Sequence, residues 1–324
     1  MKIADLRVLL KVAQLQSITA AAHQLDMSSS AASVSIKRIE QALGTQLFVR
    51  TTRKIRLTAE GERYLPLCEQ ALGLLMQGQA VINEKQECIT GEVRMAVSSE
   101  MGRNLMRVLL NELMDIHSSI TLRLHASDSR ADFYRDGVDV ALRAMKKGVA
   151  EELNLYGFKI CNIPHVVCAS PSYLKLNGEP LVPNDLSEHN ALLYKLYEVV
   201  HADWEFYDNT QQYKVKMNSD RAVNDGDIVR RWCVDGAGIA KKSAIDVADD
   251  LLSGKLKRII PDYKIPLTEM WLVLPSRQFI SPAIRLIRDE LKSKIMALRA
   301  SLLAKHILTE DEWPCDDGTR PELC

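Results

Sequence analysis

Apolar residues recur with helical spacing over the first 43 positions of the chain. The spacing predicts a helix over 3–15, whose apolar face consists of Ile3, Leu6, Leu10 and Ala13. A short alanine-rich helix over 19–25 follows, and after a turn at Asp26 and Met27 a run of serines is suited to cap a third helix. The last two helices therefore form a helix-turn-helix pair.

The second helix of this pair is amphipathic and precedes a basic hairpin. Its apolar positions, separated by four, three and four residues, are Ala32, Ile36, Ile39 and Leu43. This order of elements is typical of a winged helix-turn-helix, whose second helix enters a major groove of DNA. The residues expected to contact DNA are Ser28, Ser29, Ser30, Ser33, Lys37, Arg50, Thr51, Arg53 and Lys54. For each wing cation the alternative is an ordinary solvated surface charge.

Charge is distributed unevenly along the chain. The 42 basic and 42 acidic residues cancel overall, but residues 1–63 contain ten basic and five acidic side chains. A basic N-terminal module on an acidic body is consistent with nucleic-acid binding by that module alone.

A long helix is predicted over 61–87. Leu65, Cys68, Leu72, Leu75, Gln79 and Ile82 alternate between spacings of three and four residues. This heptad pattern favours a seam between two chains, and hence a dimer. Packing of the same stripe on the chain's own body is the alternative.

Beyond Gly91 strands alternate with helices, which predicts parallel sheets with crossover helices. The first lobe is expected to contain strands 92–97, 121–125 and 138–142 and helices 105–115 and 131–135. Residues 163–169 are expected to cross into a second lobe with strands 191–194, 212–217 and 239–240 and helices 228–235 and 244–252. Strand 271–274 returns, and helix 282–305 closes the body. Two lobes joined by two crossings form a ligand cleft.

Candidate catalytic and metal-binding groups are scattered. The seven cysteines include no CxxC pair and the seven histidines are isolated, so we expect no metal, no cofactor and no enzymatic activity. Cys233 near the cleft is interpreted as a buried thiol, with redox sensing as the alternative. A cytoplasmic location is expected, because no apolar run approaches the roughly 20 residues of a membrane span and no signal-peptide pattern is present.

Several motifs resemble those of LysR-type transcriptional regulators. In the N-terminal part they are Ser17-Ile-Thr-Ala-Ala-Ala22 with Leu25, the helix 28–40, Leu43-Gly44-x-x-Leu47-Phe48-x-Arg50 and Arg56-Leu57-Thr58-x-x-Gly61. In the second half they are Asn224-Asp225-Gly226, Gly236-Ala-Gly238-Ile-Ala, Leu252-x-x-Gly254-x-Leu256 and Pro275-Ser276-Arg277. The similarity covers residues 1 to about 300.

The resemblance implies an α-helical winged helix-turn-helix domain over 1–60 and a dimerising linker helix over 61–89. An α/β, two-lobed, periplasmic-binding-protein-like effector domain follows over 90–305. Apart from the resemblance, the acidic, proline-containing and aperiodic end of the chain predicts a flexible tail over 306–324. The resemblance further implies binding of promoter DNA, control by a small-molecule effector, and assembly into dimers or tetramers. The alternatives are a cytoplasmic solute-binding protein or enzyme on the same body, and a DNA-organising protein without ligand control.

The recognition helix departs from the family pattern. Ser29 and Val34 occupy places where relatives often have Gln and Arg, which make bidentate contacts to bases. We therefore expect much of the affinity to come from phosphate contacts by Lys37, Arg50, Arg53 and Lys54.

The resemblance also points to effector-binding residues after sheet strands. They are Ser98, Ser99, Glu100, Met101, Asp128, Ser129, Arg130, Asn224 and Asp225. Helix capping is the alternative for Ser98, Ser99 and Asp225. Lys241 and Lys242 at the cleft mouth would favour an anionic metabolite, unless they are surface lysines.

Overall fold

A computed structural model describes residues 2–50, 55–83, 89, 91–128, 137–149, 156–196, 199–275 and 280–314. The chain forms two compact units, one mainly of residues 1–88 and one mainly of residues 89–324. Within the described ranges, no helix is long and apolar enough to cross a membrane.

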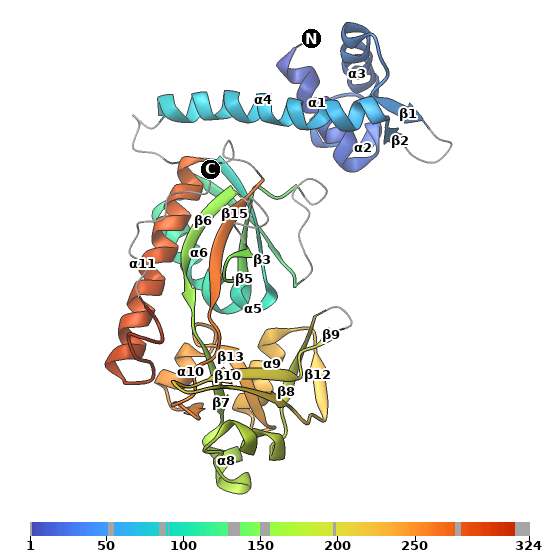
Figure 1. Cartoon of the computed structure of the whole chain (residues 1–324). Helices are drawn as coiled ribbons and strands as arrows, with labels where there is room; N and C mark the ends of the chain where they lie inside the picture. The colour runs from blue at the N-terminus through green and yellow to red at the C-terminus, as the bar shows by residue number, and fades with distance from the viewer. Residues whose placement is uncertain are drawn as a thin grey trace. The chain divides into compact units, whose positions relative to one another are not determined.

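The N-terminal unit is a three-helix cluster with a wing (Figure 1). Its elements are α1 (Ile3–Leu15), α2 (Ile18–Gln24), α3 (Ser29–Leu43), the antiparallel pair β1 (Phe48–Arg50) and β2 (Ile55–Leu57), and α4 (Ala59–Asn83). Side chains from all three short helices and from both wing strands share one buried core, which includes Leu9, Ile39 and Leu47. The predicted helix-turn-helix and hairpin are therefore confirmed.

Local hydrogen bonds set where α2 and α3 begin and end. The hydroxyl oxygens of Ser17 and Ser28 accept the amides of Ala20 and Ala31, each at 3.2 Å, so serine caps both helices. Gly44 ends α3 in the left-handed conformation, at φ +68°, which glycine adopts without strain.

The residues of the predicted seam lie on helix α4 and fall into two groups. Cys68 and Leu72 are buried in the core of their own unit, where Leu65 also packs. Leu75 is 48% exposed, and nothing is described of the side chains of Gln79 and Ile82. Packing on the chain's own body thus accounts for the first half of the stripe, and an intermolecular seam is left to the part from Leu75 onward.

The first lobe of the second unit contains a five-stranded sheet in the order β4-β3-β5-β15-β6. Its strands are β3 (Gly91–Val97), β4 (Ile120–Ala126), β5 (Val140–Lys146), β6 (Tyr156–Ile163) and β15 (Thr268–Leu274). Between β3 and β4 the chain forms α5 (Ser99–Met101), a π-helical turn over Gly102–Met106, and α6 (Arg107–Ile116). The strands β3, β4 and β5 are parallel, as expected.

Strand β6 ends at Ile163, and after Pro164 the chain enters the second lobe as β7 (His165–Ala169). There β7 lies between β13 (Ile239–Ser243) and β14 (Lys257–Ile259), antiparallel to both. The remaining strands are β8 (Leu192–Leu196), β9 (Val199–Val200), β10 (Asp203–Tyr207), β11 (Gln212–Lys216) and β12 (Arg221–Val223). The helices are α8 (Pro171–Asn177), the 3-10 helix Pro183–Glu188, α9 (Gly226–Val234) and α10 (Ala248–Leu252).

The expectation of parallel sheets holds for β3, β4 and β5 but not for the strands that join the two lobes. Strand β15 runs antiparallel to both β5 and β6, because it carries the chain back from the second lobe. The two crossings into and out of that lobe are joined where His165 Nε2 lies 2.9 Å from Thr268 Oγ1. The expected helix 131–135 lies outside the described residues.

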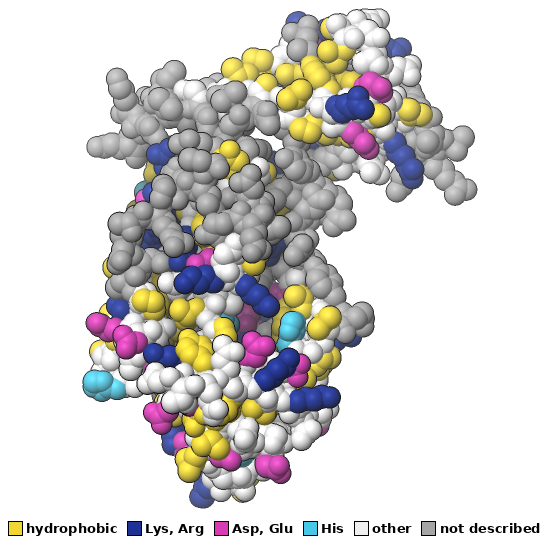
Figure 2. All heavy atoms as spheres, viewed as in Figure 1, with side chains coloured by type: hydrophobic (Ala, Val, Ile, Leu, Met, Phe, Trp, Pro, Cys, Tyr) yellow, Lys and Arg dark blue, Asp and Glu magenta, His cyan; other side chains and the backbone are white. Residues whose placement is uncertain are grey.

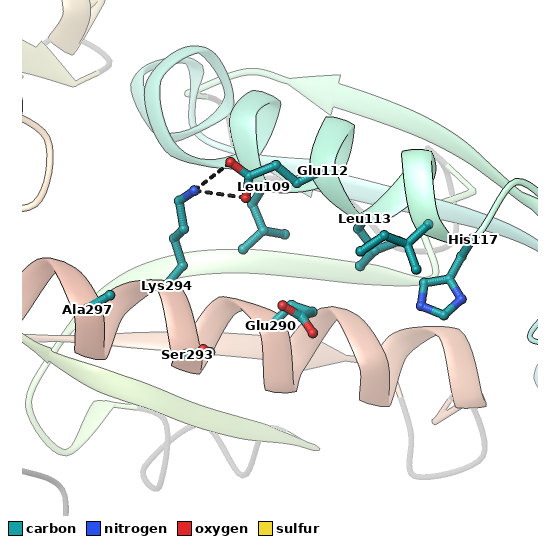
Figure 3. Close-up of a pocket in the computed structure, with 9 residues that line it drawn as sticks. Leu109, Glu112, Leu113, His117, Glu290, Ser293, Lys294 and Ala297 are labelled. Atoms are coloured by element: carbon teal, nitrogen blue, oxygen red, sulfur yellow. Dashed lines mark hydrogen bonds and ion pairs between the residues drawn. The ribbon is translucent and has the colours of Figure 1, made fainter.

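The last helix, α11 (Pro282–Ala304), packs beside α6 (Figure 3). Lys294 of α11 reaches across to both carboxylate oxygens of Glu112, at 2.8 and 2.9 Å. Leu109 and Leu113 line the groove of about 260 Å³ that remains between the two helices. The helix thus covers this side of the first lobe.

The residues after α11 correct the prediction of a flexible tail from 306 onward. Trp313 is 1% exposed, and its carbonyl accepts Arg299 Nε at 2.8 Å. Arg258 of β14 forms a buried ion pair with Glu312 and donates to the carbonyl of Ile307 at 2.7 Å. The acidic composition suggested disorder, but here an acid neutralises a buried arginine. Residues 315–324 lie outside the described part.

We predict that Trp313→Ala destabilises the second unit by about 3 to 5 kcal/mol, the usual loss for a fully buried large aromatic side chain. Chemical denaturation followed by far-UV circular dichroism measures this change. Glu310→Gln, an exposed neighbour, is the control and should leave stability unchanged. Equal stability of Trp313→Ala and the control would show that residues 305–314 do not hold the body together.

Candidate DNA interface and interlobe junction

Four of the predicted DNA-contacting residues lie on α3, namely Ser29, Ser30, Ser33 and Lys37. Ser29, Ser30 and Lys37 are exposed and Ser33 is half-buried, whereas Ser28 uses its hydroxyl oxygen as the helix cap. Val34, which the sequence analysis noted only for the missing arginine, is 52% exposed on the same helix. An exposed apolar side chain there is suited to contact a thymine methyl group.

Two carboxylates hold α3 in place. Asp5 of α1 is 1% exposed, and Arg38 Nη1 donates to its Oδ1 at 2.8 Å. Glu40 Oε1 accepts the amides of Leu47 and Phe48 at 2.8 and 3.2 Å, which joins α3 to the start of the wing. The recognition helix is thereby fixed to both of its neighbours.

The base of the wing is packed closely against α4. Thr58 Oγ1 donates to the carbonyl of Gln46 at 2.8 Å and accepts the amide of Gly61 at 3.0 Å. A Cβ on Gly61 would lie 2.3 Å from the carbonyl oxygen of Leu47, so only glycine fits. The predicted contacts Thr51, Arg53 and Lys54 lie outside the described residues, and of Arg50 only the backbone, in β1, is described.

Two of the predicted effector residues, Ser99 at the start of α5 and Asp128 after β4, contact each other. The amide of Ser99 donates to Asp128 Oδ1 at 2.7 Å, so a carboxylate of the chain already occupies the expected anion cradle. Ser98 makes no capping hydrogen bond, and Met101 is buried. Ser129 and Arg130 lie outside the described residues.

Asp225 of the second lobe contacts Arg103, which follows α5 in the first lobe. It caps α9 by accepting the amides of Asp227 and Ile228 at 2.9 and 3.3 Å, which confirms the capping alternative. The same carboxylate accepts Arg103 Nη1 at 2.6 and 2.9 Å, an ion pair between the lobes. Asn104 also reaches Asp227, at 3.2 Å. Asn224 is exposed.

Neither lysine after Ile239-Ala240 is a free surface cation. Lys242 is buried, forms an ion pair with Glu100 of the first lobe, and donates to the carbonyl of Gly226 at 2.9 Å. Lys241 is half-buried with its Nζ 5.8 Å from the centre of the Trp204 ring. The surface alternative is therefore wrong for Lys242, which lies where the lobes meet, and an anionic effector stays a prediction.

Charges of both signs are thus interspersed where the lobes meet, as on the face of this unit seen in Figure 2. Tyr194 also lies near this junction. Burial and the carboxylates of Asp128, Glu100 and Asp225 raise its pKa. Sequence reasoning missed Arg103, Asn104 and Tyr194. Hydrogen-bond partners more than 100 residues apart leave no local signal.

Cys233 packs against another cysteine. It is fully buried, and its thiol donates to the carbonyl of Cys168 at 3.3 Å. Hydrogen bonding with Cys168 and burial raise the pKa of the Cys233 thiol. A protonated, inaccessible thiol reacts slowly with oxidants, which favours the structural interpretation.

Comparison with known proteins agrees with this architecture. Residues 3–62 match the family model of bacterial regulatory helix-turn-helix proteins of the lysR family, and residues 87–295 match the LysR substrate binding domain. The chain therefore belongs to the LysR family of transcriptional regulators. It is a DNA-binding regulator with an effector-binding domain, and members of this family bind promoter DNA and small molecules and form oligomers.

Individual relatives extend over nearly the whole chain. The HTH-type transcriptional regulator DmlR of Escherichia coli K12 is 29% identical over 290 residues, which are 89% of this chain and 92% of DmlR. The structure of CrgA from Neisseria meningitidis has a TM-score of 0.56 at 25% identity, covering 92% of this chain and 99% of CrgA. A full-length variant of OxyR from Pseudomonas aeruginosa, at 16% identity, shares the fold with a TM-score of 0.62, covering 90% of this chain and 95% of that one.

The carboxylate that anchors α3 provides a test of the N-terminal unit. Burial alone raises the pKa of Asp5, but hydrogen bonds from Lys2, Ser35 and Arg38 outweigh burial and lower the pKa below its usual 3.8. A lowered carboxylate pKa adds stability above its ordinary value, and this stability is lost as the pH falls through the lowered value.

We predict that Asp5→Asn destabilises the N-terminal unit by about 1 to 3 kcal/mol near neutral pH, and less in acid. All four tryptophans lie in the second unit, at 204, 232, 271 and 313. Circular dichroism should therefore show an earlier helix transition, while the tryptophan fluorescence transition stays in place. Asp26→Asn, an exposed aspartate in the same unit, is the control. A loss of stability that is the same at neutral and acidic pH would contradict the anchoring function.

Proposed function

We propose that the protein acts in the cytoplasm by placing α3 in a major groove of promoter DNA. In this arrangement Ser29, Ser30, Ser33 and Val34 face the base edges, while Lys37 and the wing residues Arg50, Thr51, Arg53 and Lys54 contact phosphates. The observation that carries the proposal is the outward polar face of α3, which Asp5 and Glu40 hold to α1 and to the wing. Because the helix is already held in place, its side chains can contact bases without an additional entropic cost of ordering the helix.

Regulation is proposed to originate at the interlobe junction. Ser98, Ser99, Glu100 and Asp128 of the first lobe lie opposite Asp225 of the second, and Arg103 joins the two sides. A small molecule bound there competes with these cross-lobe contacts, and so changes the angle between the lobes. The response is limited by the difference in the ligand's affinity for the two arrangements. We infer no chemical step, because regulators of this family act by binding.

We predict that Lys37→Ala weakens binding to all DNA sequences alike. Removal of one phosphate contact should reduce the salt dependence of binding by about one ion, since each neutralised phosphate releases a counterion. Gel-shift titrations of the full chain at several salt concentrations measure the slope. Lys175→Ala, at an exposed lysine of the second lobe, is the matched control. An unchanged slope for Lys37→Ala would place α3 away from the DNA backbone.

Val34→Ala should act differently from Lys37→Ala. We predict that it relaxes the preference at one A·T pair of the operator by about 1 kcal/mol and leaves the salt slope unchanged, because a methyl contact involves no charge. Selection of bound sequences from a random pool compares the two variants with the parent. Identical sequence preferences for Val34→Ala and the parent would remove Val34 from the reading face.

A further inference from the structure

Lys242 lies between two carboxylates that belong to different lobes. Glu100 comes from α5 of the first lobe and forms an ion pair with the Lys242 ammonium. Asp246 follows β13 in the second lobe, the same lobe as Lys242, and also lies within electrostatic reach of it. The lysine therefore has one acidic neighbour across the junction and one beside it.

The cross-lobe contact is built into the fold. The side chains of Lys242 and Glu100 are only 7% and 12% exposed. A Cβ on Gly226, the first residue of α9, would lie 2.3 Å from Glu100 Oε2, so the absence of a side chain there admits the carboxylate. Lys242 Nζ is held at the same place by the carbonyl of Gly226.

The Lys242 ammonium is near two buried carboxyl groups, those of Glu100 and Asp246. Lys242 Nζ forms its ion pair with Glu100 Oε1, whereas Asp246 Oδ1 is a buried acceptor that receives no hydrogen bond within the described part of the chain. Burial, the charge of Glu100 and a hydrogen bond between the two carboxyl groups raise the pKa of Asp246.

Among the groups that act on Asp246, Lys242 is the cation, and the other cationic groups of the neighbouring elements have acidic partners of their own or are neutral. Arg230 of α9 is bound to Asp250 of α10, at 2.6 Å, and to Asp227. Arg103 of the first lobe is bound to Asp225. Burial, Lys241 and Lys242 lower the pKa of His165 on β7 to about 4, so this imidazole is neutral near pH 7.

We propose that Lys242 is a partner-exchange latch between the lobes. When the lobes are closed, Lys242 pairs with ionised Glu100 and Asp246 is protonated. When they open, Glu100 moves into water, Asp246 ionises, and Lys242 pairs with Asp246 inside the second lobe. Opening therefore releases one proton, and Lys242 has a partner in both states.

The sign of the pH dependence follows from this proton. The closed state binds one proton more than the open state, so lower pH stabilises closure. Between the ordinary Asp pKa of 3.8 and the raised value in the closed state, opening becomes more favourable by up to about tenfold per pH unit. The latch needs no particular effector, and so extends beyond the proposed function.

The test is single-molecule FRET on the full chain at a series of pH values from about 5 to about 8. Fluorophores are attached at Ile116 of the first lobe and Leu176 of the second, which are 77% and 84% exposed. One labelled chain per oligomer reports the ratio of open to closed lobes. Glu112→Gln, which breaks the exposed pair with Lys294, is the control and should behave as the parent.

The parent should open progressively with rising pH. Glu100→Gln should be mainly open at every pH, because Asp246 then takes over Lys242. Asp246→Asn should stay closed at every pH, because the alternative partner cannot ionise. A parent ratio that is constant with pH, closed lobes in Glu100→Gln, or parental pH dependence in Asp246→Asn would each overturn the latch. Gel shifts of the same variants test DNA binding separately, so failure of the latch and failure of the proposed function are distinguishable.

Discussion

Buried carboxylates with several donors hold together elements that are distant in the sequence. A carboxylate removed from water is stable only where charged or polar donors replace the lost hydration. Asp5 meets this requirement between α1 and α3, and Asp227 meets it between α9 and the first lobe. Glu269, which is 1% exposed at the returning strand, is matched by Trp271 and Lys159. These carboxylates therefore add polar contacts between α1 and α3, between α9 and the first lobe, and between β15 and β6.

The same rule separates rigid parts of the molecule from the part that can change. Asp5 has a donor for each carboxylate oxygen, the amide of Lys2 for one and Arg38 for the other. Glu100 and Asp246 share the ammonium of Lys242, and Asp246 Oδ1 has no hydrogen-bond partner among the described residues. An incompletely matched cluster has more than one arrangement of similar free energy, since no arrangement satisfies every group. The interlobe junction is therefore the place where a bound molecule can shift the balance most easily.

Local patterns were sufficient for the helix-turn-helix, the wing and most strands, because helical periodicity and serine caps depend on neighbours within four residues. They failed where the deciding contact is distant. The hairpin β10–β11 buries Trp204 and Phe206 against the second-lobe core, and the sequence predicted β11 as strand 212–217 but not its partner β10. Residues 306–314 were predicted to be flexible from their composition, but in the structure Arg258 binds Glu312 and Arg299 binds the carbonyl of Trp313. The sequence left open whether Lys242 lies at the cleft or on the surface for the same reason, because its partner Glu100 is distant in the chain.

The energetics of a buried ion pair explain how a small ligand can control such a body. Attraction between Glu100 and Lys242 is offset largely by the loss of hydration on closure, so the net free energy of the contact is small. Asp246 reduces the net free energy of this contact further, because Lys242 can pair with Asp246 instead. The two lobe arrangements are then close in free energy, and a ligand that prefers one by about 1 to 3 kcal/mol is enough to exchange their populations. A stronger latch would hold the lobes closed against any metabolite of ordinary affinity.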